Sequence, residues 1–529
     1  MSQSTAVPTV RETRSTDKTG IFDWRWALAL IVFLFLWLEI INQLRSEWSL
    51  NPQYSYGWTV PFLVACIFFQ RWSRRPEPSA PGYVGLTIGI TILAALTFFP
   101  TRLLAVANPD WRLLSWVMAL IVVLISLCAI NLIGGSPWLK HFSFPILFLF
   151  VAVPWPTQFE QLVVQSLMRA DSAITVQLLN LVGTLAIQHG NVIELSTGPV
   201  GIDDACTGVR SLQATFMIAL FLGEFYRMTI GRRGLLILAG AVVAFSCNIG
   251  RTFLLCEIAA HSGIDAIHRW HDPAGYTILL ICLFVLWGLS LWMQSSARSD
   301  SSLPVKPSHS MMPRIWGTLP AALLVWLILI EVCVAAWYVP PSTRPTASKS
   351  WTVAFPTTAP DFRTQGIPAA AQELLRYNEG GSAIWRTLDN HEWLLYSFRW
   401  LPGRTAALFV RNHRPDICLP ASGLAMVDES SVQLTNVNGV NLPLRFYRFR
   451  QDQIPLHIAY CYWDGRSDYD NDQQAGAEDW TIRGRVNAAL QGKREIGARM
   501  LELAVWGYDD NAEAHQALMT ELNKIVRPE

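Results

Sequence analysis

Long apolar runs are the feature that most constrains the fold of this chain. A helix that crosses the hydrocarbon core of a bilayer needs roughly 20 apolar residues. Only 15% of the residues are charged, whereas soluble domains average about 25%. The sequence therefore predicts an α-helical polytopic membrane protein with eight core transmembrane helices and a ninth, at residues 25–44, 57–70, 82–99, 113–133, 142–155, 209–226, 234–256, 274–293 and 316–338. The runs at 57–70 and 142–155 are short.

The basic residues between these runs predict the direction of the spans. Cytoplasmic connections of membrane proteins are enriched in Lys and Arg. If the N-terminus is cytoplasmic, fourteen basic residues lie inside: Arg11, Arg14, Lys18, Arg25, Arg71, Arg74, Arg75, Lys140, Arg227, Arg232, Arg233, Arg298, Lys306 and Arg314. Five lie outside: Arg45, Arg102, Arg112, Arg169 and Arg269. This bias predicts a cytoplasmic N-terminus and, after nine spans, a C-terminal part on the periplasmic side.

Residues 156–200 do not read as a span. Apolar residues recur there at steps of three and four, with Gln, Arg and Asp between them: Leu162, Val163, Leu167, Ala170, Ile174, Leu178, Leu181 and Leu185. The pattern predicts an amphipathic helix that lies on the outer membrane face or caps the bundle. The alternative is a helix that packs on the bundle without lipid contact. Residues 192–195 are then expected to be extended, with a turn at Gly198 and Pro199.

The ends of the chain differ in composition from the spans. We expect a cytoplasmic tail over 1–24, a transmembrane catalytic domain over 25–293, a Ser- and Pro-rich cytoplasmic linker over 294–315, a ninth helix over 316–338 and a soluble α+β domain over 340–529. In the last of these we expect strands at 393–400, 406–411, 442–450 and 456–462, and helices near 367–377, 479–508 and 511–526.

A polar cluster stands at the edge of the run at 209–226. It reads Asp203-Asp204-Ala205-Cys206-Thr207-Gly208-Val209-Arg210. Charged groups at a membrane edge are costly, so such a cluster is a candidate functional site. By the predicted topology, Cys206, Arg251 and His271 all fall near the outer ends of their spans. The sequence therefore brings a thiol, a guanidinium and an imidazole to one face of the membrane.

These residue types suit acyl transfer by a thiol. Cys206 would attack as a thiolate, His271 would take its proton as general base and later donate it, and Arg251 would stabilise an oxyanion. Asn248 lies one helical turn before Arg251, and Arg210 would face Cys206 if its helix began early. Asp204 would cap the next span or meet basic substrate residues.

Each of these residues also has a structural alternative. Cys206 could pack as a small apolar side chain, and Arg251 could extend to the interface. His261 and His268 compete with His271 on position alone. Asp272 could orient His271 or cap a helix before Pro273.

At this point the chain resembles the exosortase family. The resemblance is carried by DACTGVRSL at 204–212, NIGR at 248–251 and HDPAG at 271–275, with QYSYGW at 53–58 and VPWP at 153–156, and it covers about residues 25–293. The family comprises bacterial integral-membrane cysteine proteases or transpeptidases thought to process exported proteins that have a C-terminal PEP-CTERM sorting tail. The resemblance implies a triad of Cys206, Arg251 and His271 in the inner membrane, with no cofactor.

The segment HRPDICLPASG at 413–423 is similar to a domain fused to, or encoded beside, some exosortases and linked to exopolysaccharide export. Cys418 and Cys461 are the only cysteines after residue 340. They could form a disulfide in an oxidising compartment. The alternative is a second Cys/His site with His413.

The expected partners are membrane-anchored proteins with C-terminal sorting tails, the lipid bilayer and exopolysaccharide machinery. A formal net charge of +1 gives no general attraction to nucleic acid. The cysteines and histidines lack zinc-site spacing, so we expect no metal. The competing hypothesis is a non-enzymatic membrane component of exopolysaccharide export or assembly, and a third makes the C-terminal domain a binding module for substrate or polysaccharide.

Overall fold

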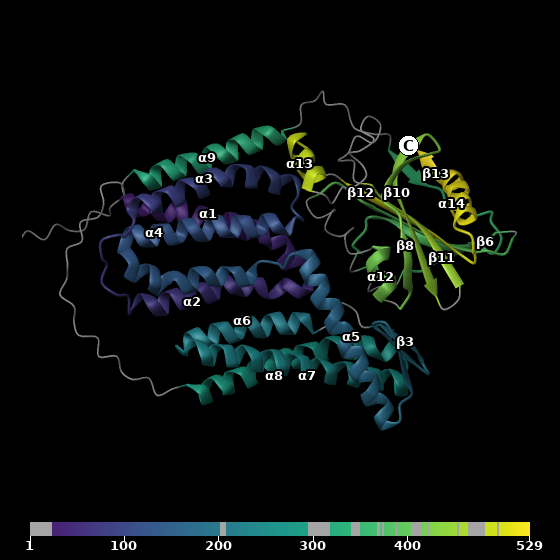
Figure 1. The fold of residues 1–529 in the computed structure, drawn as a ribbon, viewed down its shortest axis with the longest axis horizontal. Helices are drawn as coiled ribbons and strands as arrows, with labels where there is room; N and C mark the ends of the chain where they lie inside the picture. The colour runs from purple at the N-terminus through teal and green to yellow at the C-terminus, as the bar shows by residue number, and fades with distance from the viewer. Residues whose placement is uncertain are drawn as a thin grey trace, which may run out of the picture.

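The computed structural model describes residues 24–201, 208–294, 318–339, 350–367, 371–372, 375–387, 389–403, 414–421, 423–451, 454–463, 482–494 and 497–529. It is elongated, with a bundle of long helices on one side and a strand-rich domain on the other (Figure 1). We call the end of the bundle that carries this domain the domain end, and the opposite end the linker end.

The apolar runs form helices at the predicted places. In chain order these are α1 (Trp24–Leu50), η1 (Pro52–Thr59) with α2 (Val60–Trp72), α3 (Val84–Ala107), α4 (Arg112–Leu147) with η2 (Phe148–Ala152), α5 (Thr157–Val182), α6 (Val209–Phe225), α7 (Ile230–Ser262), α8 (Asp265–Met293) and α9 (Leu319–Tyr338). Among the described residues, six stretches are long and apolar enough to cross a membrane: 27–50, 84–107, 112–152, 230–262, 269–293 and 319–338. The helices α2 and α6, at 13 and 17 residues, are shorter. The described helices therefore support a polytopic helical membrane protein, and the count of nine spans stays a prediction.

The 41-residue stretch from Arg112 to Ala152 folds back on itself. At Gly135 the backbone leaves the helical region, with a φ of +68° that favours glycine. Arg112 Nη1 donates to the Trp155 carbonyl at 3.1 Å, and Trp116 Nε1 donates to the Pro154 carbonyl at 2.9 Å. The two ends of the stretch therefore meet, so it forms two antiparallel helical segments, as the runs at 113–133 and 142–155 predict.

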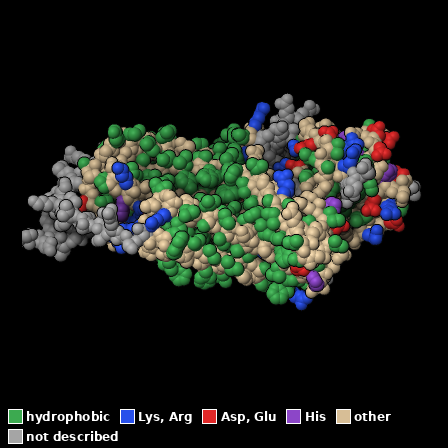
Figure 2. Space-filling view, turned by 60° about the horizontal axis from the view of Figure 1, so that its bottom comes forward, with side chains coloured by type: hydrophobic (Ala, Val, Ile, Leu, Met, Phe, Trp, Pro, Cys, Tyr) green, Lys and Arg blue, Asp and Glu red, His purple; other side chains and the backbone are tan. Residues whose placement is uncertain are grey.

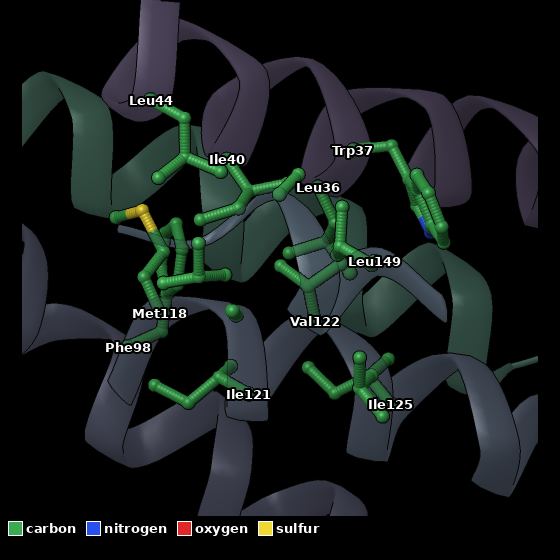
Figure 3. Packing of buried hydrophobic residues seen from close by; sticks show 14 of the residues in the cluster. Leu36, Trp37, Ile40, Leu44, Phe98, Met118, Ile121, Val122, Ile125 and Leu149 are labelled. Carbon is green, nitrogen blue, oxygen red and sulfur yellow. The ribbon is translucent and has the colours of Figure 1, made fainter. Parts of the chain in front are cut away.

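The bundle core joins α1, α3 and the folded α4. Leu36 and Ile40 of α1 pack with Met118 and Val122 of α4 and with Phe98 of α3, all of them buried (Figure 3). Transfer of a large apolar side chain from water into such a core contributes about 1.5–3 kcal/mol to the free energy of folding. Where the helices associate within lipid, close packing stabilises the contact instead of the hydrophobic effect.

An ion-pair cluster binds α9 to this core. Arg102 of α3 contacts Glu331 of α9 at 2.7 Å and Glu39 of α1 at 3.3 Å. The helix α9 therefore lies beside α1 and α3, across the bundle from α8, which precedes it in the sequence (Figure 1). The sequence placed Arg102 in an outer loop, and that placement is wrong because the α3 helix continues through Pro100 to Ala107.

Charged side chains are concentrated toward the two ends of the molecule. Hydrophobic side chains cover the middle of the face in Figure 2, whereas acidic and basic side chains gather over the strand-rich domain. At the linker end, Glu224 of α6 pairs with Arg71 of α2 and with Arg233 of α7. The apolar middle is what a bilayer core requires of the surface in contact with it.

The helix α5 and a small hairpin sheet lie at the domain end (Figure 1). The amphipathic helix predicted there is confirmed. Part of its apolar surface is exposed: Leu181 is 83% exposed and Leu185, just past the helix, 81%. The face that packs on α7 mixes apolar side chains such as Met168 with polar ones such as Asp171. The sheet comprises β1 (Ala186–His189), β2 (Val192–Leu195) and β3 (Gly198–Gly201). The predicted turn at Gly198 and Pro199 is wrong, because these residues pair with β2 as the start of β3.

The C-terminal domain contains an eight-stranded antiparallel sheet. Along the sheet the strands are β5 (Arg363–Gln365), β6 (Glu379–Arg386), β7 (Glu392–Trp400), β12 (Ala498–Trp506), β11 (Ile454–Trp463), β10 (Val440–Gln451) and β8 (Ala425–Glu429), and β9 (Gln433–Val437) also pairs with β10. The helix α14 (Asn511–Ile525) packs on one face through Leu518 and Leu522. The short helix α12 (Pro415–Ala421) packs on the other through Leu419. A two-stranded sheet of β4 (Trp351–Val353) and β13 (Val526–Pro528) completes the domain.

The sequence predicted four of these elements correctly and assigned one to the wrong type. The strands near 393–400, 442–450 and 456–462 and the helix at 511–526 are confirmed. The predicted helix at 479–508 is wrong: among its described residues only α13 (Ile482–Leu490) is helical, and Ala498–Trp506 is a central strand. A strand buried on both faces is a continuous apolar run, which periodicity cannot distinguish from a buried helix. The predicted strand at 406–411 lies outside the described residues, as do parts of the predicted helix at 367–377.

The helix α13 attaches the C-terminal domain to the bundle. Arg485 Nη2 contacts Asp110 Oδ2 at 3.0 Å, and both side chains are buried. The Arg485 guanidinium lies over the ring of Trp111. Trp337 of α9 donates to the Ala489 carbonyl at 2.9 Å. The domain is therefore seated on α3, α9 and the loop between α3 and α4.

Removal of one partner from the buried Asp110–Arg485 pair tests this attachment. We expect Arg485→Ala to lower the free energy of unfolding by about 3–5 kcal/mol, because it leaves a buried carboxylate without its counter-charge. The measurement is thermal unfolding of the purified protein in detergent. Arg386→Ala, which breaks an exposed pair with Glu392, is the control and should cost less than about 1 kcal/mol. Equal midpoints for the two variants would contradict a buried ion pair at this contact.

Candidate functional site

The candidate site includes residues at the start of α6 and on α7 and α8. Two of its predicted members, Cys206 and Asp204, lie outside the described residues, which resume at Gly208, two residues after the cysteine. Gly208 precedes α6 with a φ of +71°, so the helix begins at Val209 and does not continue back through this glycine. Arg210 therefore lies in the first turn of α6. Arg210 would face Cys206 only if this helix began earlier in the sequence, and Gly208 is not part of the helix.

Gly208 packs directly against α7. A Cβ built on Gly208 would lie 2.8 Å from Asn248 Cγ, which is closer than a real Cβ contact. Asn248 is buried on α7. The segment that leads out of the Cys206 loop is therefore held on the α7 face that carries Asn248, and only glycine fits there.

Arg251 lies one turn further along the same face of α7. Its side chain is 8% exposed, and its Nη2 donates to the backbone carbonyl of His271 at 3.1 Å. The same nitrogen lies 3.5 Å from the Cβ position of Gly275 in α8. A Cβ at position 275 would therefore be in van der Waals contact with the guanidinium. The structure therefore brings Asn248, Arg251 and the backbone of His271 together across α7 and α8.

His271 lies inside α8 and not in a loop. The sequence placed it in the loop that opens the eighth span, and this is wrong because α8 begins at Asp265 and continues through Pro273. Asp272 consequently does not cap the start of the helix. Its Oδ1 lies 3.0 Å from His271 Nδ1. This contact favours a proton on Nδ1 and leaves Nε2 as the basic nitrogen.

The competing histidines are placed differently. His261 lies in the last turn of α7, where it is exposed and contacts Glu257 of its own helix. The side chain of His268 is not described. Of the two histidines with described side chains, His271 is therefore the one whose backbone meets Arg251.

Asp171 of α5 is a member of this site that the sequence reasoning missed. It is 0% exposed, and its Oδ2 accepts a hydrogen bond from Thr252 Oγ1 at 2.6 Å. Burial raises the pKa of this carboxyl to about 6, while Thr252, Arg251 and Asn248 act in the opposite direction by stabilising the charged form. The only sequence signal was an acidic residue on the polar face of an amphipathic helix, which ordinarily faces water.

An apolar cluster joins the elements that carry the site residues. It joins Met168 of α5, Ile193 and Leu195 of β2, Val209 at the start of α6 and Cys256 of α7. The cluster holds α5 and the hairpin sheet against α7. It includes Val200 and Val209, so the described chain is anchored both before and after the segment that contains Cys206.

Metal and disulfide chemistry were also considered at the sequence level. Within the described ranges no group of three or more His, Cys, Asp or Glu side chains is arranged to hold a metal ion. Cys461 packs in the cluster on the α14 face of the sheet, whereas Leu419 of α12, next to Cys418, packs on the opposite face. Pairing of Cys418 with Cys461 stays a prediction.

Comparison with known protein families finds one match. Residues 48–288 match the family described as transmembrane exosortase. No curated protein and no solved structure matches the chain. The matched range includes α2 to α7 and most of α8, and therefore every described residue of the candidate site. It supports assignment of the membrane part of the chain to this family, and it does not extend to the C-terminal domain.

The close contact between Gly208 and Asn248 can be tested by a small change. We expect Gly208→Ala to lower the midpoint of thermal unfolding, with a cost of at least about 1 kcal/mol, because alanine disfavours positive φ and its Cβ would displace Asn248. Gly250→Ala is the control, since no atom lies within 4 Å of its Cβ position on α7. This control should be neutral or slightly stabilising. A Gly208→Ala protein as stable as wild type would show that the two helices do not approach this closely.

Proposed function

Because residues 48–288 match the transmembrane exosortases, we propose that this protein is a membrane-embedded cysteine endopeptidase or transpeptidase. Its substrates are exported, membrane-anchored proteins with a C-terminal sorting tail of the PEP-CTERM type. The observation that carries the proposal is the contact of Arg251 with the His271 backbone, beside the glycine that follows the Cys206 loop.

The proposed reaction is acyl transfer through Cys206. The Cys206 thiolate attacks the carbonyl carbon of the scissile peptide bond, and the negative charge moves to the carbonyl oxygen. Arg251 stabilises that oxyanion, because a guanidinium offers several N–H donors and a positive charge. His271 takes the thiol proton and gives it to the leaving amine, so that a thioester remains on the enzyme.

Water or an acceptor amine then attacks the thioester. His271 removes a proton from this nucleophile, the C–S bond breaks, and the thiolate is regenerated. The contact of Asp272 with His271 Nδ1 supports the role of His271, since it orients the ring and favours the tautomer with a basic Nε2. Asn248 and Arg210 are supporting residues, and Asp204 would meet basic residues of the substrate tail.

The charge distribution supports an orientation in the bacterial inner membrane. Arg71, Arg74, Arg75 and Lys140 lie at or beside the linker-end turns of α2 and α4, and Arg232 and Arg233 lie in the first turn of α7. A cytoplasmic linker end follows from the positive-inside rule. The site and the C-terminal domain would then lie on the periplasmic side, where exported substrates arrive.

The C-terminal domain is the proposed link to exopolysaccharide export. The backbone of His189 in β1 lies 3.1 Å from the Cβ position of Gly423, next to α12. The domain therefore contacts the membrane part at two places. One is α13 on α3, and the other is Gly423 on the hairpin sheet, which precedes Cys206 in the sequence. This position suits a module that holds a substrate or a polysaccharide component near the site.

Substitution of the nucleophile is the primary test. With a tagged substrate that carries a PEP-CTERM-type tail, we expect Cys206→Ala and Cys206→Ser to abolish tail removal, because neither side chain supplies a thiolate. The measurement is the shift of the tagged substrate to a smaller species on immunoblots. Cys66→Ala, in an exposed position on α2, is the matched control and should process the substrate normally. Normal processing by Cys206→Ala would overturn the enzyme assignment and favour a non-enzymatic export component.

Substitution of Arg251 tests the oxyanion role. We expect Arg251→Lys to reduce the processing rate by about 10²–10³, because a lysine keeps the charge but cannot keep the planar guanidinium at the same place. Arg232→Lys is the control, since Arg232 bonds the Met293 carbonyl at the linker end. The midpoint of unfolding is measured for both proteins. Equal rates for the two variants would show that Arg251 has no part in the chemistry.

A further inference from the structure

A buried carboxylate lies behind the proposed active-site face of α7. Asp171 of α5 is fully buried, and Thr252 Oγ1 donates to its Oδ2 at 2.6 Å. Thr252 follows Arg251 directly and lies one turn from Asn248, whose carbonyl also accepts from the threonine hydroxyl at 3.2 Å. Asp171 is therefore attached to the turn of α7 that presents Asn248 and Arg251.

The other elements packed on α5 bring apolar groups to this region. The cluster between α5, the hairpin sheet and α6 contains Ile193, Leu195 and Val209. On α7, the charged side chain that acts on Asp171 is Arg251, and it favours the ionised carboxylate. The buried carboxylate is thus near enough to the Arg251 guanidinium for the two charges to interact.

Burial opposes ionisation of Asp171, so the charged form is less favourable in the folded protein than the protonated form. Burial raises its pKa from 3.8 to about 6. For a group whose pKa is raised by folding, the contribution to stability is present below the unfolded value and is lost as the pH rises through about 6. Above that pH an uncharged side chain of the same shape would make a more stable protein. A structural role does not require a charge that lowers stability, whereas sites that perform chemistry commonly hold such groups.

We propose that Asp171 is a positioning residue of the acyl-transfer site, whose negative charge holds the Asn248–Arg251 face of α7 in its working arrangement. The carboxylate acts on the reaction through two contacts that are already described. Asn248 supports Gly208 at the exit of the Cys206 loop, and Arg251 donates to the His271 carbonyl. A loss of charge at position 171 would therefore reach both the loop of the nucleophile and the oxyanion group.

The alternative is that Asp171 only packs α5 on α7 through its bond to Thr252. The two explanations differ in how rate and stability respond to the loss of charge. A packing residue that loses a bond destabilises the protein and leaves the rate per folded molecule unchanged. A positioning charge that is removed without loss of shape lowers the rate while stability stays the same or rises.

Asp171→Asn separates these explanations, since asparagine keeps the size and an acceptor oxygen for Thr252. We expect kcat for tail removal to fall about 10-fold or more at pH 7.5, with KM changed less than twofold. The unfolding midpoint should equal or exceed that of wild type at pH 7.5, and this difference should vanish below about pH 6, where the native carboxyl becomes protonated. Both quantities are measured on the full-length protein in detergent, with the rate expressed per folded molecule.

Two further variants serve as matched controls. Glu257→Gln removes a carboxylate that accepts from Thr184 at 2.8 Å and joins α7 to the chain beyond α5 in the same way. It should leave kcat at the wild-type value. Thr252→Val removes the hydroxyl that donates to Asp171 and should lower kcat in the same direction as Asp171→Asn.

The inference rests on the proposed function, and the outcomes distinguish the two. If Cys206→Ala still removes the tail, the proposed enzyme itself is wrong. If Cys206→Ala is inactive while Asp171→Asn has a wild-type kcat, or loses stability at pH 7.5 in proportion to its rate, only the positioning role of Asp171 is overturned.

Discussion

Charged groups inside this bundle depend on partners from other helices, because a bilayer core offers no water to solvate them. Arg102 of α3 meets Glu39 of α1 and Glu331 of α9. Arg112 of α4 meets Glu47 of α1 and Glu160 of α5. Each contact selects one arrangement of neighbouring helices out of the many that apolar packing alone would permit.

The same constraint explains where the candidate site is. The polar face of α5 cannot face lipid, so it turns inward and brings Asp171 to Thr252 of α7. This contact fixes the turn of α7 that carries Arg251. The guanidinium in turn bonds the backbone of α8 at His271. The polar groups of this cluster are therefore connected through bonds between three different helices.

The sequence predicted the helices well because a span has a strong and local signal, a run of apolar residues of the right length. It also predicted that Arg251 and His271 approach each other, since charge bias places both near the same end. It failed where the signal depends on the surroundings. Asp171 lies on a polar face that ordinarily faces water but is buried here, and the strand at 498–506 is buried on both sides.

By itself, the sequence determined the membrane class, the order of the helices and the residue types available for thiol chemistry, because these follow from composition and short motifs. Only the tertiary structure decided that α9 returns to α1 and α3, that His271 belongs to a helix, and that a carboxylate from α5 stands behind Arg251. Those facts depend on which polar groups find partners across helices far apart in the chain. Local sequence patterns do not predict that pairing, because the partners lie in different segments of the chain and neither segment by itself indicates the other.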